Sequence, residues 1–170
     1  MKKVRDRAFA ILVLLGPLLL PMEAAWGGCT DPAGPRVEWR RCYHDDRNLS
    51  GVDMSGAELR EVTFQRSNLS RANLSKTKAF RAKLISANLI GANLEDSQFG
   101  EADFTRANLS GATLRRANLQ RVRFYRANLT GADFTDARIE GADLSQADLS
   151  HAIWTDGKHV CAPGSMGQCN

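Results

Sequence analysis

The chain has 170 residues, of which 43% are hydrophobic and 7% aromatic, with 23 basic and 19 acidic side chains. Four of the basic and two of the acidic residues lie in the first 27 positions, which leaves 19 basic and 17 acidic residues in the other 143. This near-neutral balance argues against a protein that binds nucleic acid through general positive charge. The length is sufficient for one domain with its own core.

Residues 1–27 have the features of a secretory signal peptide. The chain begins with four basic residues, Lys2, Lys3, Arg5 and Arg7, and continues with an apolar run over 8–22. That order is typical of exported chains, and the run is shorter than the ~20 apolar residues that span a bilayer. We expect cleavage after Gly27, or after Ala25, and a secreted or periplasmic mature chain without a transmembrane segment.

Residues 28–46 are expected to form an N-terminal cap. The four cysteines fall in two close pairs, Cys29 with Cys42 and Cys161 with Cys169. Of the three possible connectivities, pairing within each terminus closes short loops, and export favours oxidised sulfur. A metal site that adds His151 and His159 to the second pair is the alternative, but its spacing is unlike compact zinc patterns. Lipid anchoring at Cys29 is a minor alternative to a soluble mature chain.

Residues 47–156 contain an apolar repeat with a period of five. The large residues begin with Leu49, Met54, Leu59 and Phe64 and continue to Trp154, and only Ala79 interrupts them. From Met54 onward, a small residue, usually alanine, lies two positions before each. A step of five advances about 140° on an α-helix, and on a flat strand it reverses the face, so neither forms an apolar stripe. The chain must therefore bend every five residues and stack its coils, with the small and large residues inside.

The repeat closely matches a known motif. Residues 87–94 read ANLIGANL and residues 131–135 read GADFT, and both resemble the A(D/N)LXX motif of the pentapeptide-repeat family. The resemblance implies an all-β fold, a right-handed quadrilateral β-helix with four repeats in each coil. Val37 and Trp39 fit the same register, so the coil is expected to begin at 37. Residues 157–170, with the second cysteine pair, are expected to cap the C-terminal end.

Few residues could carry catalytic chemistry. The chain has three histidines, His44, His151 and His159, without a Ser, His and Asp cluster, a phosphate loop or spaced metal ligands. The serines and threonines lie at bends, where hydrogen bonding explains them. His44 falls at an inward position and is interpreted as a packing residue. We therefore expect no enzymatic activity and no cofactor.

Surface charge supplies the candidate binding residues. With four repeats in each coil, one face carries Arg66, Arg106, Tyr125 and Arg126, and the adjoining corner carries Arg121 and Arg123. An ordinary solvated surface is one interpretation, and a face that binds anions or the cell envelope is the other.

The predicted function is that of an exported, non-catalytic structural or interaction module. Its expected partner is a protein, a glycan or an envelope component that the sequence does not identify. Some pentapeptide-repeat proteins mimic duplex DNA and bind DNA gyrase, which gives an alternative function. The signal peptide, the cysteines and the mixed surface charge argue against that alternative, and no nucleic-acid partner is expected.

Overall fold

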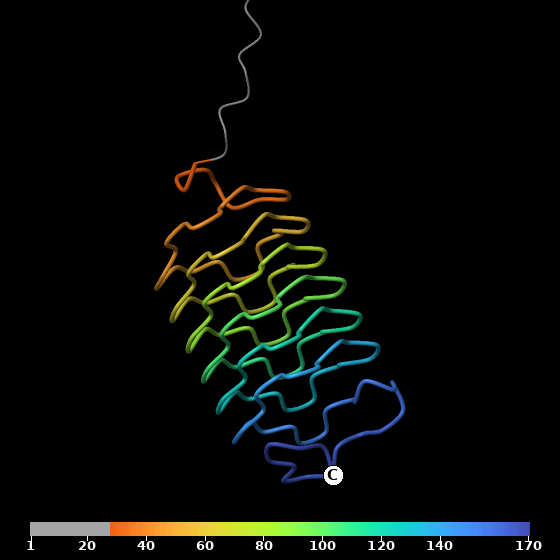
Figure 1. Ribbon diagram of the computed structural model, residues 1–170. Helices are drawn as coiled ribbons and strands as arrows, with labels where there is room; N and C mark the ends of the chain where they lie inside the picture. Colours follow the sequence, from red (N-terminus) through yellow and green to blue (C-terminus); the bar gives the residue numbers. More distant parts are fainter. Residues whose placement is uncertain (1–27) are drawn as a thin grey trace, which may run out of the picture.

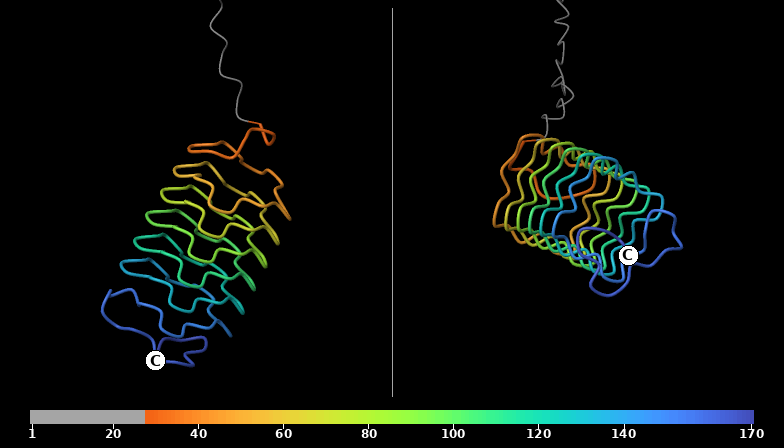
Figure 2. Two further views of the ribbon diagram at one scale, coloured as in Figure 1. Left: turned by 180° about the vertical axis from the view of Figure 1, so that it is seen from behind. Right: turned by 60° about the horizontal axis from the view of Figure 1, so that its bottom comes forward.

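The computed structural model describes residues 28–170; the predicted signal peptide and its cleavage site lie outside these residues. The chain winds into a stack of similar coils, with residue 28 near one end and the C-terminus at the other (Figures 1 and 2). Parallel bridges join each bridge residue to the residue 20 positions further on, from Glu38 with Glu58 to Asp133 with Ile153. One coil therefore holds four five-residue repeats, as the family resemblance implies.

The coils are joined by single-residue bridges. Residues 28–170 contain no helix and no extended strand, because the chain turns again after each bridge residue. Hydrogen bonding is still that of a parallel sheet. The Asn88 N–H donates to the Ser67 carbonyl of the preceding coil at 2.9 Å, and the Leu89 N–H donates to the Asn108 carbonyl of the next coil at 2.7 Å. Each coil is thus bonded to both neighbours on every side.

A tight turn closes each repeat. In one of them, the Ala92 N–H donates to the Leu89 carbonyl at 3.0 Å, and Gly91 between them has a φ of +63°. A positive φ at this place is the geometry of a type II turn. At most corners the residue is not glycine: 18 such residues in the described part of the chain, many of them arginine, have φ between 54° and 61°. The corners therefore project long charged side chains despite the preference of this region for glycine.

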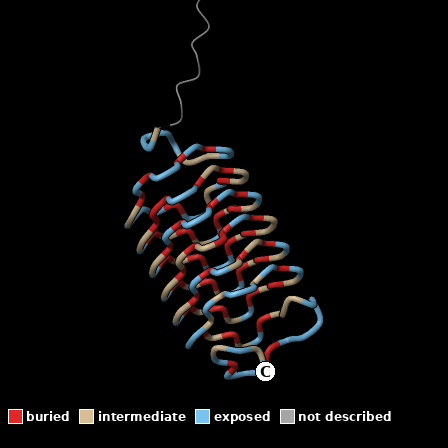
Figure 3. The backbone as a smooth tube through the Cα atoms, viewed as in Figure 1, coloured by how far each residue is buried: buried red, intermediate tan, exposed pale blue. Residues whose placement is uncertain are grey.

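The core is a set of ladders that run along the rod. Buried residues alternate with exposed ones around every coil and line its interior (Figure 3). One ladder consists only of leucines: Leu49, Leu69, Leu89, Leu109, Leu129 and Leu149. Another contains Phe104 and Phe124, whose rings stack with centroids 5.3 Å apart. Ala79 occupies an inward position that holds a large residue in the other repeats. The same position in the next coil is occupied by Phe99, with 1% of its surface exposed.

Both cysteine pairs form disulfides, as predicted: Cys29 with Cys42, and Cys161 with Cys169. The first ties the segment before the coils to the first coil. The second pins a tail that folds back across the last coil through antiparallel bridges from Asp148 to Met166 and from Ile153 to Val160. These bridges cover part of the backbone edge that a solenoid otherwise leaves open. No helix within residues 28–170 has the length and apolarity to cross a membrane.

Candidate functional site

The predicted arginine-rich face occupies one edge of the rod. Arg66, Arg106 and Arg126 are corner residues with φ values of 57° to 58°. Their separations of 40 and 20 residues place them on the same corner, because one coil contains 20 residues. Tyr125 lies beside Arg126. The repeat geometry therefore places these side chains in a row that runs parallel to the rod axis.

Acidic side chains of the preceding coil neutralise several of the predicted arginines. Arg66 donates two hydrogen bonds to Asp46, at 2.8 and 2.7 Å, and these bonds lower the pKa of the Asp46 carboxyl. Arg121 pairs with Glu101 at 3.3 Å. Arg123 pairs at 2.9 Å with the aspartate 20 positions before it. These three guanidinium groups are therefore less available to an anionic partner than their number in the sequence indicates.

Two arginines on this edge have no acidic partner within residues 28–170. Arg126 donates a hydrogen bond to the amide oxygen of Gln146 at 2.7 Å, and its guanidinium carbon lies 5.1 Å from the ring centroid of Tyr125. Arg106 makes neither an ion pair nor a side-chain hydrogen bond in the same part of the chain. We call Arg106, Tyr125 and Arg126 the arginine patch.

Ion pairs between coils recur along this surface. Seven of the eleven ion pairs in the described residues join side chains 20 positions apart. One corner alternates in sign along the rod, in the order Arg41, Glu61, Arg81, Glu101 and Arg121. This pairing was not predicted from the sequence, although an offset of 20 between opposite charges follows directly from four repeats in each coil.

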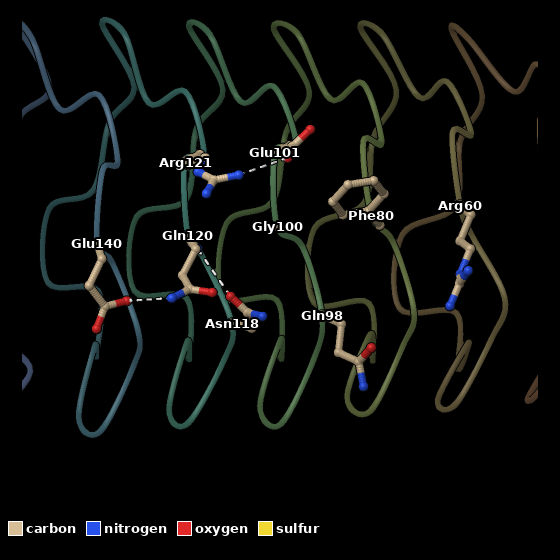
Figure 4. Close-up of a pocket in the computed structure, with 9 residues that line it drawn as sticks. All are labelled: Arg60, Phe80, Gln98, Gly100, Glu101, Asn118, Gln120, Arg121 and Glu140. Carbon is tan, nitrogen blue, oxygen red and sulfur yellow. Dashed lines mark hydrogen bonds and ion pairs between the residues drawn. The ribbon is translucent and has the colours of Figure 1, made fainter.

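A hollow of about 350 Å³, which was not predicted from the sequence, lies on the adjacent side. Five consecutive coils contribute residues at equivalent positions: Arg60, Phe80, Gly100, Gln120 and Glu140 (Figure 4). The Gln120 amide donates to Glu140 at 3.1 Å. The sequence contains one indication of this hollow: Phe80 and Gly100 are both at outward positions and lie 20 residues apart, which is one coil.

The described residues contain no group of three His, Cys, Asp or Glu side chains arranged to hold a metal ion. Both sulfur atoms of the second cysteine pair are in a disulfide, so neither is a thiolate ligand. His44 lies inside the first coil with its ring centroid 3.8 Å from that of Trp39, and burial lowers its pKa. A buried neutral imidazole packed on an indole acts as a core residue.

Comparison with known proteins agrees with this architecture. The family model described as pentapeptide repeats matches residues 48–84, 82–121 and 117–153, which is more than half of the chain. No curated protein sequence matches significantly.

Among solved structures, a pentapeptide repeat protein of the Arabidopsis thaliana thylakoid lumen is 26% identical, with 66% of this chain and 83% of that protein covered and a TM-score of 0.58. The pentapeptide repeat protein Rfr23 of the cyanobacterium Cyanothece 51142 is 24% identical over 69% of this chain and 90% of its own, with a TM-score of 0.38. QnrB1, a plasmid-mediated fluoroquinolone resistance protein, is 23% identical over 72% of this chain and 68% of its own, with a TM-score of 0.32. From the family match, its repeats and its stacked coils, the chain belongs to the pentapeptide-repeat family.

Proposed function

We propose that this protein is an exported, non-catalytic interaction module that binds an anionic component of the cell envelope through the arginine patch. The observation that carries the proposal is the lack of acidic partners at Arg106 and Arg126, beside Arg66, Arg121 and Arg123, which are each paired with an acidic residue of the preceding coil. Unpaired guanidinium groups are suited to phosphate and carboxylate groups, which they bind in a bidentate manner.

Export is supported by the N-terminal sequence and by the disulfides. Disulfides persist in oxidising compartments and are rare in the cytosol, and both cysteine pairs are bonded. The similar Arabidopsis thaliana protein is itself from a lumen. Because the Cys29 sulfur is bonded to Cys42, the disulfide favours a mature chain without a lipid on that residue. The mass of the mature protein will identify its first residue and any attached lipid.

The shape suits a rigid binding surface. As a right-handed quadrilateral β-helix, the protein would present flat sides on which side chains repeat once per coil, ~4.8 Å apart. The spacing of Arg106 and Arg126 is therefore fixed by the backbone and loses little conformational freedom on binding. A polymer or a membrane surface with repeated anionic groups can contact both arginines at once.

The test compares charge reversal on the patch with the same change elsewhere. We expect the R106E/R126E double variant to lose about tenfold or more in affinity for envelope fractions. R36E/R71E is the matched control, because Arg36 and Arg71 are also corner residues, with φ values of 58° and 57°, and lie on other corners. Glutamate is compatible with this conformation, which Glu61 and Glu101 adopt.

Two further probes separate the sources of negative charge. Vesicles that contain phosphatidylglycerol report on lipid headgroups, and a soluble anionic polysaccharide reports on an envelope glycan. Binding to either that weakens with added salt and with R106E/R126E supports the proposal. Equal envelope binding by the parent protein and by R106E/R126E would overturn it.

A further inference from the structure

One aromatic ring lies on the surface of the rod at a turn of the chain. Phe80 points outward with 37% of its surface exposed, although most residues at its position in the repeat are polar. The equivalent residue of the next coil is Gly100. A Cβ atom added to Gly100 would lie 3.5 Å from Cδ2 of Phe80. Figure 4 shows the ring beside the Gly100 backbone, between the coils of Gly100 and Arg60. The missing side chain leaves room for the ring to approach the backbone.

The fold itself does not require glycine at this position. Gly51 and Gly91 are corner glycines with φ values of +66° and +63°, whereas Gly100 has no positive φ. A Cβ at Gly100 would make only ordinary van der Waals contacts. The equivalent residues of the two following coils are Gln120 and Glu140. Neither backbone conformation nor steric crowding accounts for the glycine, and its effect is to keep the hollow around Phe80 open.

Polar groups surround this apolar floor. Within the described residues the side-chain amide of Gln98 makes no hydrogen bond, and the amide of Gln120 is held by Glu140 at 3.1 Å. The charges that line the hollow balance, with two arginines and two glutamates. Side-chain amides around an aromatic floor can donate and accept hydrogen bonds, and ionised carboxylates accept them, without selecting for a charged ligand.

We propose that this hollow binds a neutral pyranose residue of a polysaccharide. The guanidinium carbon of Arg81 lies 4.9 Å from the centroid of the Phe80 ring, so the apolar C–H face of the sugar would lie on the opposite face of that ring. The hydroxyl groups of the sugar would exchange hydrogen bonds with Gln98, Gln120 and Glu140. The volume of about 350 Å³ lies within the ~300–1,000 Å³ of small-ligand sites. A phosphorylated ligand gains nothing from a balanced set of charges, and an apolar peptide side chain would leave the amides without partners. The site is separate from the arginine patch and extends the proposed function to a second class of ligand.

The experiment titrates the full chain, as processed by the exporting cell, with cellotetraose, chitotetraose and maltotetraose in a calorimeter. We expect at least one of these neutral tetrasaccharides to bind saturably. Gly100→Gln adds a side chain next to Phe80, and Phe80→Ser removes the aromatic floor. Each is expected to weaken binding by about tenfold or more. Ser110→Gln is the matched control, since Ser110 holds the same position in the repeat on a different side.

The result is independent of the arginine patch. R106E/R126E should bind the same tetrasaccharide as the parent does, which separates failure of this inference from failure of the proposed function. Circular dichroism will show that Gly100→Gln and Phe80→Ser remain folded. The inference is overturned if none of the three sugars binds, or if folded Gly100→Gln binds as tightly as the parent protein.

Discussion

The all-leucine ladder allows the packing of this rod to be tested one coil at a time. Leu69, Leu89, Leu109 and Leu129 have 0% of their surface exposed, and each lies between the leucines of two neighbouring coils. Replacing a buried leucine by alanine removes favourable burial and leaves a cavity, at a cost of about 2.7–5.0 kcal/mol. The backbone cannot easily collapse into the cavity, because the Leu89 N–H donates to the next coil at 2.7 Å. We therefore expect Leu89→Ala to lower the free energy of unfolding by about 3–5 kcal/mol.

The first coil should respond differently. Leu49 is 4% exposed and has a leucine neighbour of the ladder on one side only. Its replacement by alanine should cost about 2 kcal/mol, near the lower limit for buried leucines. Urea denaturation followed by circular dichroism, with the disulfides intact, measures both variants. A cost below about 1 kcal/mol for Leu89→Ala would refute the tightly packed interior. A larger cost at Leu49 than at Leu89 would refute the ladder argument.

Three other predictions concern the N-terminal end and the alternative function. Replacing Cys29 and Cys42 by serine opens a loop with a sequence separation of 13 and should lower stability by about 3 kcal/mol in urea denaturation. Because burial lowers the pKa of His44 from 6.5, the unfolded chain binds a proton more readily. Stability should therefore fall as the pH drops below about 6.5, by up to ~1.4 kcal/mol per pH unit. His44→Phe, which can stack on Phe64, should remove this fall. Stoichiometric protein should not inhibit gyrase supercoiling of DNA.

Each of these predictions has a contradicting outcome. Unchanged stability of the double serine variant would show that the end of the rod does not depend on the disulfide. If the His44→Phe variant still loses stability between pH 7 and 5.5, the loss is caused by another titratable group. Inhibition of gyrase at equimolar protein would restore the DNA-mimicking function and count against an envelope module.

The sequence predicts the architecture because the core is periodic. A step of five is incompatible with one face of a helix or a flat strand, so the bend follows from Leu84, Leu89 and Leu94 alone. The number of repeats in each coil does not follow from that step, since coils with other numbers of sides would also point these residues inward. The family resemblance supplied it, and the bridge from Asn88 to Asn108 agrees.

The surface was harder to predict. Arg66 and Arg106 look alike in sequence, yet Asp46 neutralises one and no acidic residue within residues 28–170 neutralises the other. That distinction depends on which side chains lie next to each other in neighbouring coils, and it cannot be predicted from the charge composition. The hollow around Phe80 was missed for the same reason, because its lining comes from five coils that are distant in sequence.

The ion pairs between coils have a consequence for how the chain finds its register. Inside the rod, successive repeats are nearly interchangeable, so a chain that looped out one repeat would still place alanines and leucines inward. The outer side chains would not tolerate this slip, because Arg66 would leave Asp46 and Arg81 would leave Glu101. Each exposed pair contributes only about 0–1 kcal/mol, but a slip would break several together and place like charges side by side. In this protein the core makes the coils stable, and the charged corners distinguish one alignment of the coils from another.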